Sequence, residues 1–235
     1  MISAYVLHRW LYQEHSLIVE LFTRQEGRVR VIAKGARRSK KGQAAALQPF
    51  SMLNVAWVGQ RELKTLTAVE LADISQPLQG DFLYCGFYMN ELLQRLVPEQ
   101  AVVGELFDDY HSSLQLLREG VAIEPVLRRF EWLLLQHLQL DFDWNYQADD
   151  GSPIAPQHRY YFDPSVGFLP VVSGREPTPH YDGDDILKMA KFEVTDERLL
   201  RQFKWLMRAA LRQHLGPKPL QSRALFAQRQ LPTSR

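Results

Sequence analysis

Hydrophobic and polar residues alternate along the first part of the chain with a period of two, which is typical of β-strands with one buried face. Turns rich in Gly, Pro, Gln and charged residues separate the alternating segments. The pattern predicts five strands, at residues 4–8, 16–23, 27–34, 52–58 and 65–72. Five short strands in succession favour a small barrel, built mainly as an antiparallel meander. A basic third strand followed by a long loop fits an OB-type barrel, although an SH3-like barrel has a similar number of strands.

After about residue 80 the period changes to that of helices. Helices are predicted at residues 82–97, 104–118, 125–140, 184–191 and 196–215. Thr195 is expected to cap the last of them. Frequent Gly and Pro break the helical period between residues 143 and 182, where we expect an irregular insert that contains a small hairpin. The predicted architecture is α+β, with a barrel domain at residues 1–79 and a helical domain that includes this insert at residues 80–235.

Charge is distributed unevenly along a chain whose formal net charge is only +1. Residues 24–41 contain eight Arg or Lys and one Glu, and residues 198–235 contain nine Arg or Lys and no acid. The remaining residues together carry a net charge of −15. Two basic regions on an acidic body are expected of a protein that binds a polyanion, because neutralising phosphates and releasing their counterions supplies most of the affinity.

The predicted strand at residues 27–34 places two kinds of side chain on opposite faces. Val29, Val31 and Ala33 share one parity, whereas basic residues share the other. A glycine-flanked basic loop at residues 35–42 follows, and we expect it to be flexible and solvated. The alternative is an ordinary solvated face, or Lys residues that protect a strand edge. The candidate phosphate-binding residues here are Arg28, Arg30, Lys34, Arg37, Arg38, Lys40 and Lys41.

The predicted helix at residues 196–215 carries two stripes. Its apolar stripe consists of Leu200, Phe203, Met207 and Leu211. Its basic stripe, about a quarter turn away, consists of Arg201, Lys204, Arg208 and Arg212. Like charges at this spacing repel one another by roughly a few tenths of a kcal/mol per pair. Either an anionic partner or acids of the preceding segment, such as Asp182, Asp184 and Asp185, would offset this repulsion.

The predicted helix at residues 125–140 is apolar on more than one side. Its main face consists of Leu127, Phe130, Leu134 and Leu138. Arg128, Trp132 and Leu135 lie together on nearly the opposite side. Either this helix is central to a bundle and buried all round, or Arg128 overhangs a groove that receives an anionic peptide with an apolar tip.

The sequence lacks the motifs of several common catalytic sites. It contains no phosphate-binding loop, no nucleophile elbow, no dinucleotide-binding glycine fingerprint and no His-Glu-x-x-His zinc helix. Cys85 is the only cysteine and the seven histidines are scattered, which excludes a disulfide framework and a cysteine zinc cluster. We therefore predict no enzymatic activity, no metal and no cofactor. The N-terminal segment lacks a secretory pattern and no apolar run is long enough to span a bilayer, which predicts a cytoplasmic protein.

Several short motifs, taken in order, are similar to those of one protein family. Residues 27–41, followed by residues 47–50, resemble the amino-terminal domain of the RecO family of bacterial DNA repair proteins. The helical part carries further motifs of this family, at residues 88–93, 105–110, 127–131 and 216–223. The resemblance covers most of the chain, with the insert as the exception.

This resemblance implies an OB fold on a helical domain, in a recombination mediator that hydrolyses no nucleotide. Proteins of this family bind single- and double-stranded DNA and anneal complementary strands. They also engage the acidic carboxy-terminal tail of the single-stranded DNA-binding protein and work with RecR to load RecA. The expected place of action is the nucleoid in the cytoplasm. Many relatives carry a four-cysteine zinc module near the insert; this sequence lacks those cysteines, so zinc is not carried over.

The resemblance also assigns roles to residues. The basic residues of both regions become candidate DNA-binding residues, and Arg128 becomes a candidate for binding the acidic tail. We add Trp132 and Leu135 as the adjoining apolar wall of that site. Two alternatives come from other classes: an RNA- or ribosome-associated OB protein, and an adaptor that binds only proteins.

Overall fold

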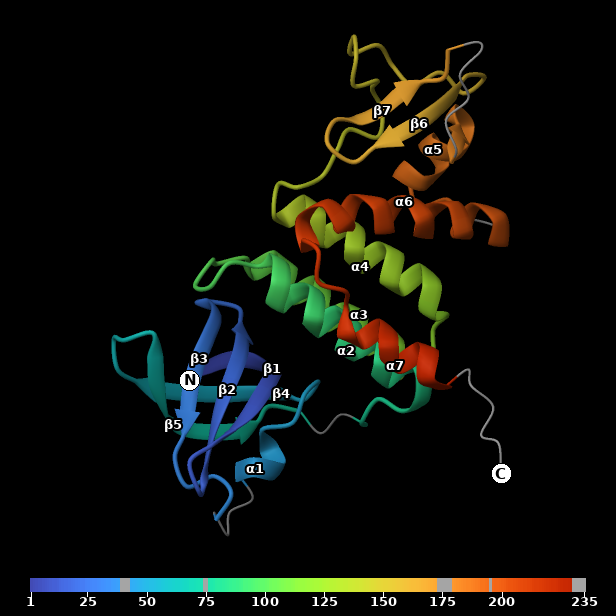
Figure 1. The fold of residues 1–235 in the computed structure, drawn as a ribbon. Coiled ribbons are helices and arrows are strands. Elements are labelled where there is room, and N and C mark those ends of the chain that lie inside the picture. The colour runs from blue at the N-terminus through green and yellow to red at the C-terminus, as the bar shows by residue number, and fades with distance from the viewer. Residues whose placement is uncertain (39–42, 74–75, 173–178, 195, 230–235) are drawn as a thin grey trace. The chain divides into compact units, whose positions relative to one another are not determined.

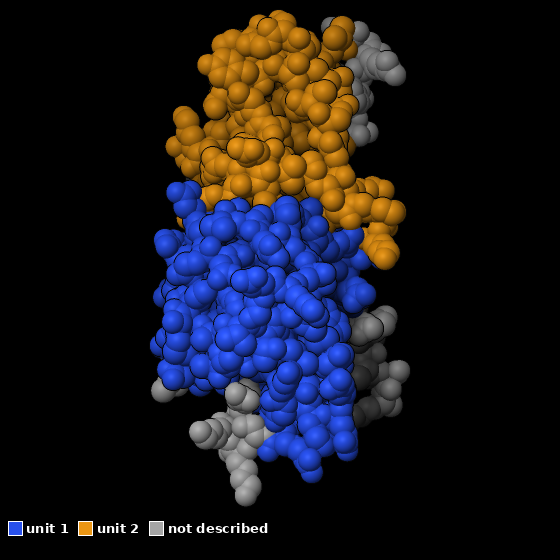
Figure 2. All heavy atoms as spheres, turned by 90° about the vertical axis from the view of Figure 1, so that its left-hand side faces the viewer, with its two compact units in different colours: residues 1–123, 219–235 blue, residues 124–218 orange. Residues whose placement is uncertain are grey.

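The computed structural model describes residues 1–38, 43–73, 76–172, 179–194 and 196–229. The chain divides into two compact units (Figure 2): unit 1 contains residues 1–123 and 219–235, and unit 2 contains residues 124–218. These units do not coincide with the division expected at residue 80, because two long helices pack on the barrel within unit 1. The domain boundary at residue 80 stays a prediction.

A closed five-stranded barrel forms the first part of unit 1 (Figure 1). The strand order is β1-β2-β3-β5-β4, and neighbours are antiparallel except for the parallel pair of β3 and β5. The OB-type barrel that the alternating pattern predicted is confirmed. Its strands are β1 (Ile2–Tyr12), β2 (Ser16–Thr23), β3 (Gly27–Ala33), β4 (Met52–Val58) and β5 (Leu63–Leu71).

Strand β1 is longer than the segment that alternation predicted. The residues at its end are exposed or half-buried, so they show no alternation of apolar and polar side chains. They nevertheless pair with β2, with Trp10 opposite Ile18 and Tyr12 opposite Ser16. Backbone pairing with a neighbouring strand, rather than burial of one face, therefore sets the end of β1.

The barrel core is built from the inward-facing parity of each strand. Leu17, Val19 and Leu21 of β2 are buried in it. Val29, Val31 and Ala33 of β3 are buried there too, which confirms the inward face predicted for this strand.

Helices α2 (Gly80–Leu96) and α3 (Gly104–Arg118) cover one part of the outer face of the barrel. The ring of Phe107 in α3 lies 5.5 Å from that of Tyr5 and 5.6 Å from that of Phe22. Short helix α1 (Gln43–Ala46) precedes β4, and α7 (Gln221–Arg229) packs along α2. There Glu91 of α2 accepts hydrogen bonds from the backbone N and Oγ of Ser222, at 2.8 and 2.6 Å.

Unit 2 combines helices with a small antiparallel sheet of order β7-β6-β8. The hairpin expected in the insert is present as β6 and β7, and β8 adds a strand that the sequence did not predict. The elements are α4 (Ile123–His137), β6 (Arg159–Asp163), β7 (Gly167–Pro170), β8 (His180–Asp182), α5 (Gly183–Ala190) and α6 (Glu197–Leu215).

Asp196 caps helix α6, because its Oδ1 accepts a hydrogen bond of 2.8 Å from the backbone N of Leu199. Thr195, which we expected to cap this helix, lies outside the described residues. Within the described ranges, no helix combines the length and the apolar character that crossing a membrane requires.

Candidate nucleic-acid interface

Three exposed cations follow one another at the end of β3. Lys34, Arg37 and Arg38 all have exposed side chains, and we call them the cationic edge. The backbone N of Arg37 donates to the carbonyl O of His15 at 3.1 Å, and its Nη1 donates to that of Glu14 at 2.9 Å. The turn between β1 and β2 therefore holds the cationic edge in a defined place on the barrel.

The start of the basic loop is anchored, contrary to the expectation of a flexible, solvated segment. The side chain of Ala36 is 1% exposed and belongs to the barrel core. A methyl group is small enough to enter the core beside the exposed Arg37, and the sequence pattern gave no sign of it. Lys40 and Lys41 lie outside the described residues, so their part in DNA binding stays a prediction.

Arg28 is not a surface residue, which corrects the prediction that it contacts DNA. It is 7% exposed, and its Nε and Nη2 donate to Oε1 of Glu20, which is itself 2% exposed. Its Nη1 donates to the carbonyl O of Val97, at the end of α2. Gln94 of α2 donates to the other oxygen of Glu20 at 2.6 Å. Helix α2 covers this part of the outer face, so the cation of Arg28 neutralises a buried acid.

Two other cations of the basic run are paired with acids. Arg30 is half-buried, and its Nη2 lies 2.7 Å from Oε1 of Glu99. Its Nη1 lies 3.7 Å from Oε1 of Glu62. Arg24 donates to both carboxylate oxygens of Asp108, and these hydrogen bonds lower the pKa of Asp108. Because their charge is already matched, Arg24 and Arg30 have less to offer a phosphate than the cationic edge has.

The basic stripe of α6 is exposed at three of its four positions. Arg201, Arg208 and Arg212 are exposed, whereas Lys204 is half-buried and its Nζ donates to Oε1 of Glu124. Two of the acids considered as partners of this stripe pair with other cations: Asp185 pairs with Arg198 and Asp184 pairs with Lys188. Lys204 is therefore a poor candidate for phosphate binding, and Arg201, Arg208 and Arg212 remain candidates.

The expected groove, with Arg128 above it and Trp132 and Leu135 as its wall, is wrong for Arg128 and Leu135, because both side chains are buried. Arg128 is 3% exposed and its Nη2 donates to Oε1 of Glu131 at 2.7 Å; Leu135 is 1% exposed. Trp132 is half-buried, with its ring edge-on to that of Phe192 at 5.0 Å. The burial of Arg128 and Leu135 is that expected of a helix packed on more than one side. Nε and Nη1 of Arg128 nonetheless lack hydrogen-bond partners among the described residues.

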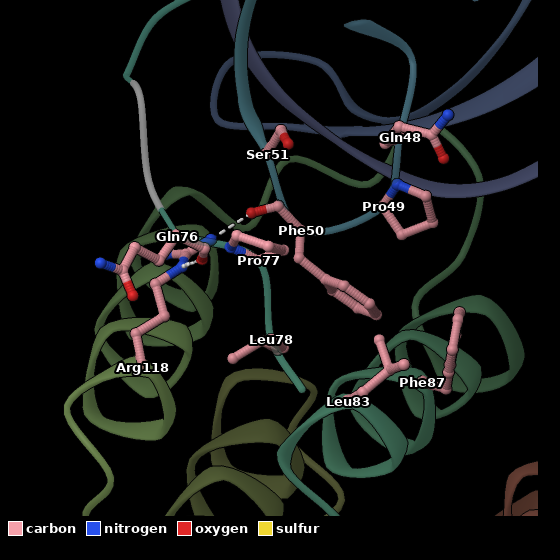
Figure 3. Close-up of a pocket in the computed structure, with 10 residues that line it drawn as sticks. All are labelled: Gln48, Pro49, Phe50, Ser51, Gln76, Pro77, Leu78, Leu83, Phe87 and Arg118. Carbon is pink, nitrogen blue, oxygen red and sulfur yellow. Dashed lines mark hydrogen bonds between the residues drawn. The ribbon is translucent and has the colours of Figure 1, made fainter. Parts of the chain in front are cut away.

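A pocket of about 330 Å³ in unit 1 is apolar and was not predicted from the sequence (Figure 3). Phe50, Leu83 and Phe87 line it, and Arg118 lies at its edge. The guanidinium of Arg118 donates to the carbonyl O of Phe50 and, at 3.2 Å, to that of Gln76. These bonds join the segments before β4 and after β5. Arg118 is thus a structural residue, and we place no part of the interface here.

An exposed tryptophan near the end of β1 was also missed. Trp10 is 40% exposed and borders an open hollow of about 500 Å³. The sequence pattern could not find it, because the predicted first strand stopped before this residue. Among the described residues, no three His, Cys, Asp or Glu side chains gather as a metal site requires.

The fold joins a closed OB-type barrel to a helical part, and comparison with known proteins identifies the family. Residues 1–75 match the family model described as Recombination protein O N terminal, and residues 78–224 match that described as Recombination protein O C terminal. The chain is 49% identical over 225 residues to the DNA repair protein RecO of Idiomarina loihiensis, which covers 95% of this chain and 96% of that protein.

Other relatives agree with this assignment. The DNA repair protein RecO of Haemophilus influenzae is 41% identical over 224 residues, covering 95% of this chain and 94% of that protein. That of Actinobacillus pleuropneumoniae serotype 7 is 39% identical over 223 residues, covering 94% and 92%. The chain belongs to the RecO family of DNA repair proteins.

Proposed function

We propose that this chain is a non-enzymatic recombination mediator. It binds single- and double-stranded DNA, anneals complementary strands, engages the tail of the single-stranded DNA-binding protein, and acts with RecR to load RecA on the nucleoid in the cytoplasm. The observation that carries the proposal is the cationic edge, where Lys34, Arg37 and Arg38 are exposed on a barrel of a DNA repair family. Arg201, Arg208 and Arg212 of α6 supply a second basic surface for the same ligand.

The test of this function is fluorescence anisotropy with labelled single-stranded DNA, duplex DNA and RNA of equal length. We expect both DNAs to bind and their affinity to fall steeply with salt, because phosphate contacts release counterions. Purified protein should also accelerate annealing of complementary strands without added nucleotide. RNA binding much tighter than DNA binding would favour an RNA-associated OB protein. Absence of binding to all three would favour an adaptor that binds only proteins.

The acidic tail is proposed to bind beside α4. Arg128 has a buried guanidinium whose Nε and Nη1 lack hydrogen-bond partners among the described residues, and such groups call for an explanation. Nη1 lies 3.6 Å from Oε2 of Glu124, too far for a hydrogen bond. A tail carboxylate that displaces Glu124 would satisfy these donors, and the partly exposed ring of Trp132 would contact an aromatic side chain of the tail.

We predict that Arg128→Lys weakens binding of a peptide with acidic residues and a terminal Phe by roughly 10-fold or more, which is the loss of a charged hydrogen bond of about 1.5–3 kcal/mol. Lysine keeps the charge beside Glu131 but loses the planar fork. Arg129→Lys, at the exposed neighbouring position, is the matched control and should bind as the parent does. If folded Arg128→Lys binds the peptide as tightly as the parent, the tail site lies elsewhere, first on the basic stripe of α6.

A further inference from the structure

The outer face of the barrel carries a hollow that brings apolar side chains together with one paired arginine. It is the open hollow of about 500 Å³ lined by Trp10, Ile18, Arg30, Glu62 and Leu63. Trp10 and Leu63 are each 40% exposed. The ring of His8, which is also exposed, lies 4.5 Å from the ring of Trp10. An isolated exposed apolar residue needs no explanation, but here several lie together in one concave surface.

Strand register shows how this hollow is placed relative to the cations. Trp10 pairs with Ile18, and Ile18 pairs with Ile32, so these three residues form one row across β1, β2 and β3. Lys34 follows Ala33, the last residue of β3, so it lies just past the end of the strand that contributes Ile32 to the row. Two residues of chain span at most about 7 Å, which is close enough for a single ligand to reach both the apolar row and the cationic edge.

On the opposite side of the hollow the positive charge is already paired with acids. Arg30 lies there, and its guanidinium contacts Glu99 and Glu62. The side toward Lys34, Arg37 and Arg38 carries exposed positive charge. A ligand that fits both parts has an apolar, planar group for the hollow and an anionic group about one strand repeat away, on the side of the cationic edge. A nucleotide of a single strand has this arrangement, because its base and its phosphate extend in different directions from the sugar.

We propose that the Trp10 hollow is a base-binding subsite: one unpaired base of a single-stranded DNA stacks on the indole of Trp10, while its flanking phosphates contact the cationic edge. This inference rests on the proposed DNA-binding function and adds a preference to it. The bases of a duplex are stacked on their neighbours and do not reach the hollow, so the subsite favours single strands. The indole face accepts any base, so the subsite confers no sequence specificity.

The experiment removes the indole from the protein, by substitution of Trp10, or the bases from the DNA, by use of an abasic strand. Binding of parent, Trp10→Ala and Trp10→Phe is measured against a labelled single strand and against an abasic strand of the same length. Trp10→Ala should bind the normal strand roughly 5- to 150-fold more weakly than the parent, which is the effect of losing one stacked base. It should bind the abasic strand and duplex DNA as the parent does. Trp10→Phe should retain most of the affinity, because its ring still stacks.

Two further measurements separate the possible outcomes. Leu11→Ala removes a more exposed apolar side chain from the next position of β1 and should change nothing. The dependence of affinity on salt should be the same for Trp10→Ala and the parent, because no phosphate contact is lost. The inference is overturned if folded Trp10→Ala binds the normal strand as tightly as the parent does. It is also overturned if the substitution lowers the affinity for the abasic strand by as much as it lowers the affinity for the normal strand. A parent protein that binds neither strand overturns the proposed function as well.

Discussion

Replacing Arg28 by Ala is expected to lower the free energy of unfolding by about 3–5 kcal/mol, the usual cost of removing one partner of a buried ion pair. The carboxylate of Glu20 is 2% exposed and would keep only its hydrogen bond from Gln94 among the contacts described above. The carbonyl O of Val97 would also lose its donor. Urea unfolding followed by circular dichroism measures the change, which should appear as a lower midpoint with an unaltered slope.

Arg30→Ala is the matched control, because Arg30 lies two residues further along the same strand. The ion pair of Arg30 with Glu99 is partly exposed to solvent, with side-chain exposures of 39% for Arg30 and 37% for Glu99. The free energy of unfolding should therefore fall by less than about 1 kcal/mol. Glu20→Met combined with Arg28→Met should restore much of the stability, since neither charge is then buried. Equal stability of Arg28→Ala and Arg30→Ala would show that Glu20 finds water or another partner when Arg28 is removed.

The second large effect concerns DNA affinity. Arg37→Ala combined with Arg38→Ala should weaken binding of single-stranded DNA by roughly 25-fold at 0.1 M salt, since each phosphate contact contributes a slope of about 0.7 on a single strand. The slope of the logarithm of the binding constant against that of salt should fall by about 1.4. Anisotropy titrations at several salt concentrations give both values. Stability should change little, because both side chains are exposed.

Arg24→Ala combined with Lys64→Ala removes the same number of positive charges from unit 1, and neither residue lines the Trp10 hollow. Because Arg24 is paired with Asp108 and Lys64 with Glu26, the double variant should keep nearly the parent's affinity and slope. Equal losses in the two double variants would mean that net charge alone, rather than the cationic edge, governs binding. Unchanged affinity and slope for the Arg37 and Arg38 variant would remove the cationic edge from the DNA surface.

Much of the barrel was predictable because each strand buries one face in a shared core. The alternation of Val29 and Val31 with Arg28 and Arg30 carries that information directly. The outer face is different, since residues of equal parity meet different surroundings along one strand. Within β3, Arg28 lies under α2 whereas Arg30 is partly exposed, and the sequence of the strand alone does not separate the two.

The same reason explains the misplaced groove on α4. A helical wheel groups Arg128, Trp132 and Leu135 correctly by angle, but it does not tell which neighbouring element covers that side. In the structure Glu131, one turn from Arg128 and also buried, provides the charge that makes burial of the guanidinium possible. Trp10 was missed for a related reason: the end of β1 is fixed by pairing with β2, and exposed residues in such a position have no periodic pattern.

The most direct test of the account is to locate the DNA on the protein. A single strand that carries photoreactive 5-iodouracil is crosslinked to the parent protein, and the modified peptides are mapped by mass spectrometry. The account predicts crosslinks within residues 8–18 and 30–38, which contain Trp10 and the cationic edge. Crosslinks confined to residues 124–218, with none on the barrel, would contradict it.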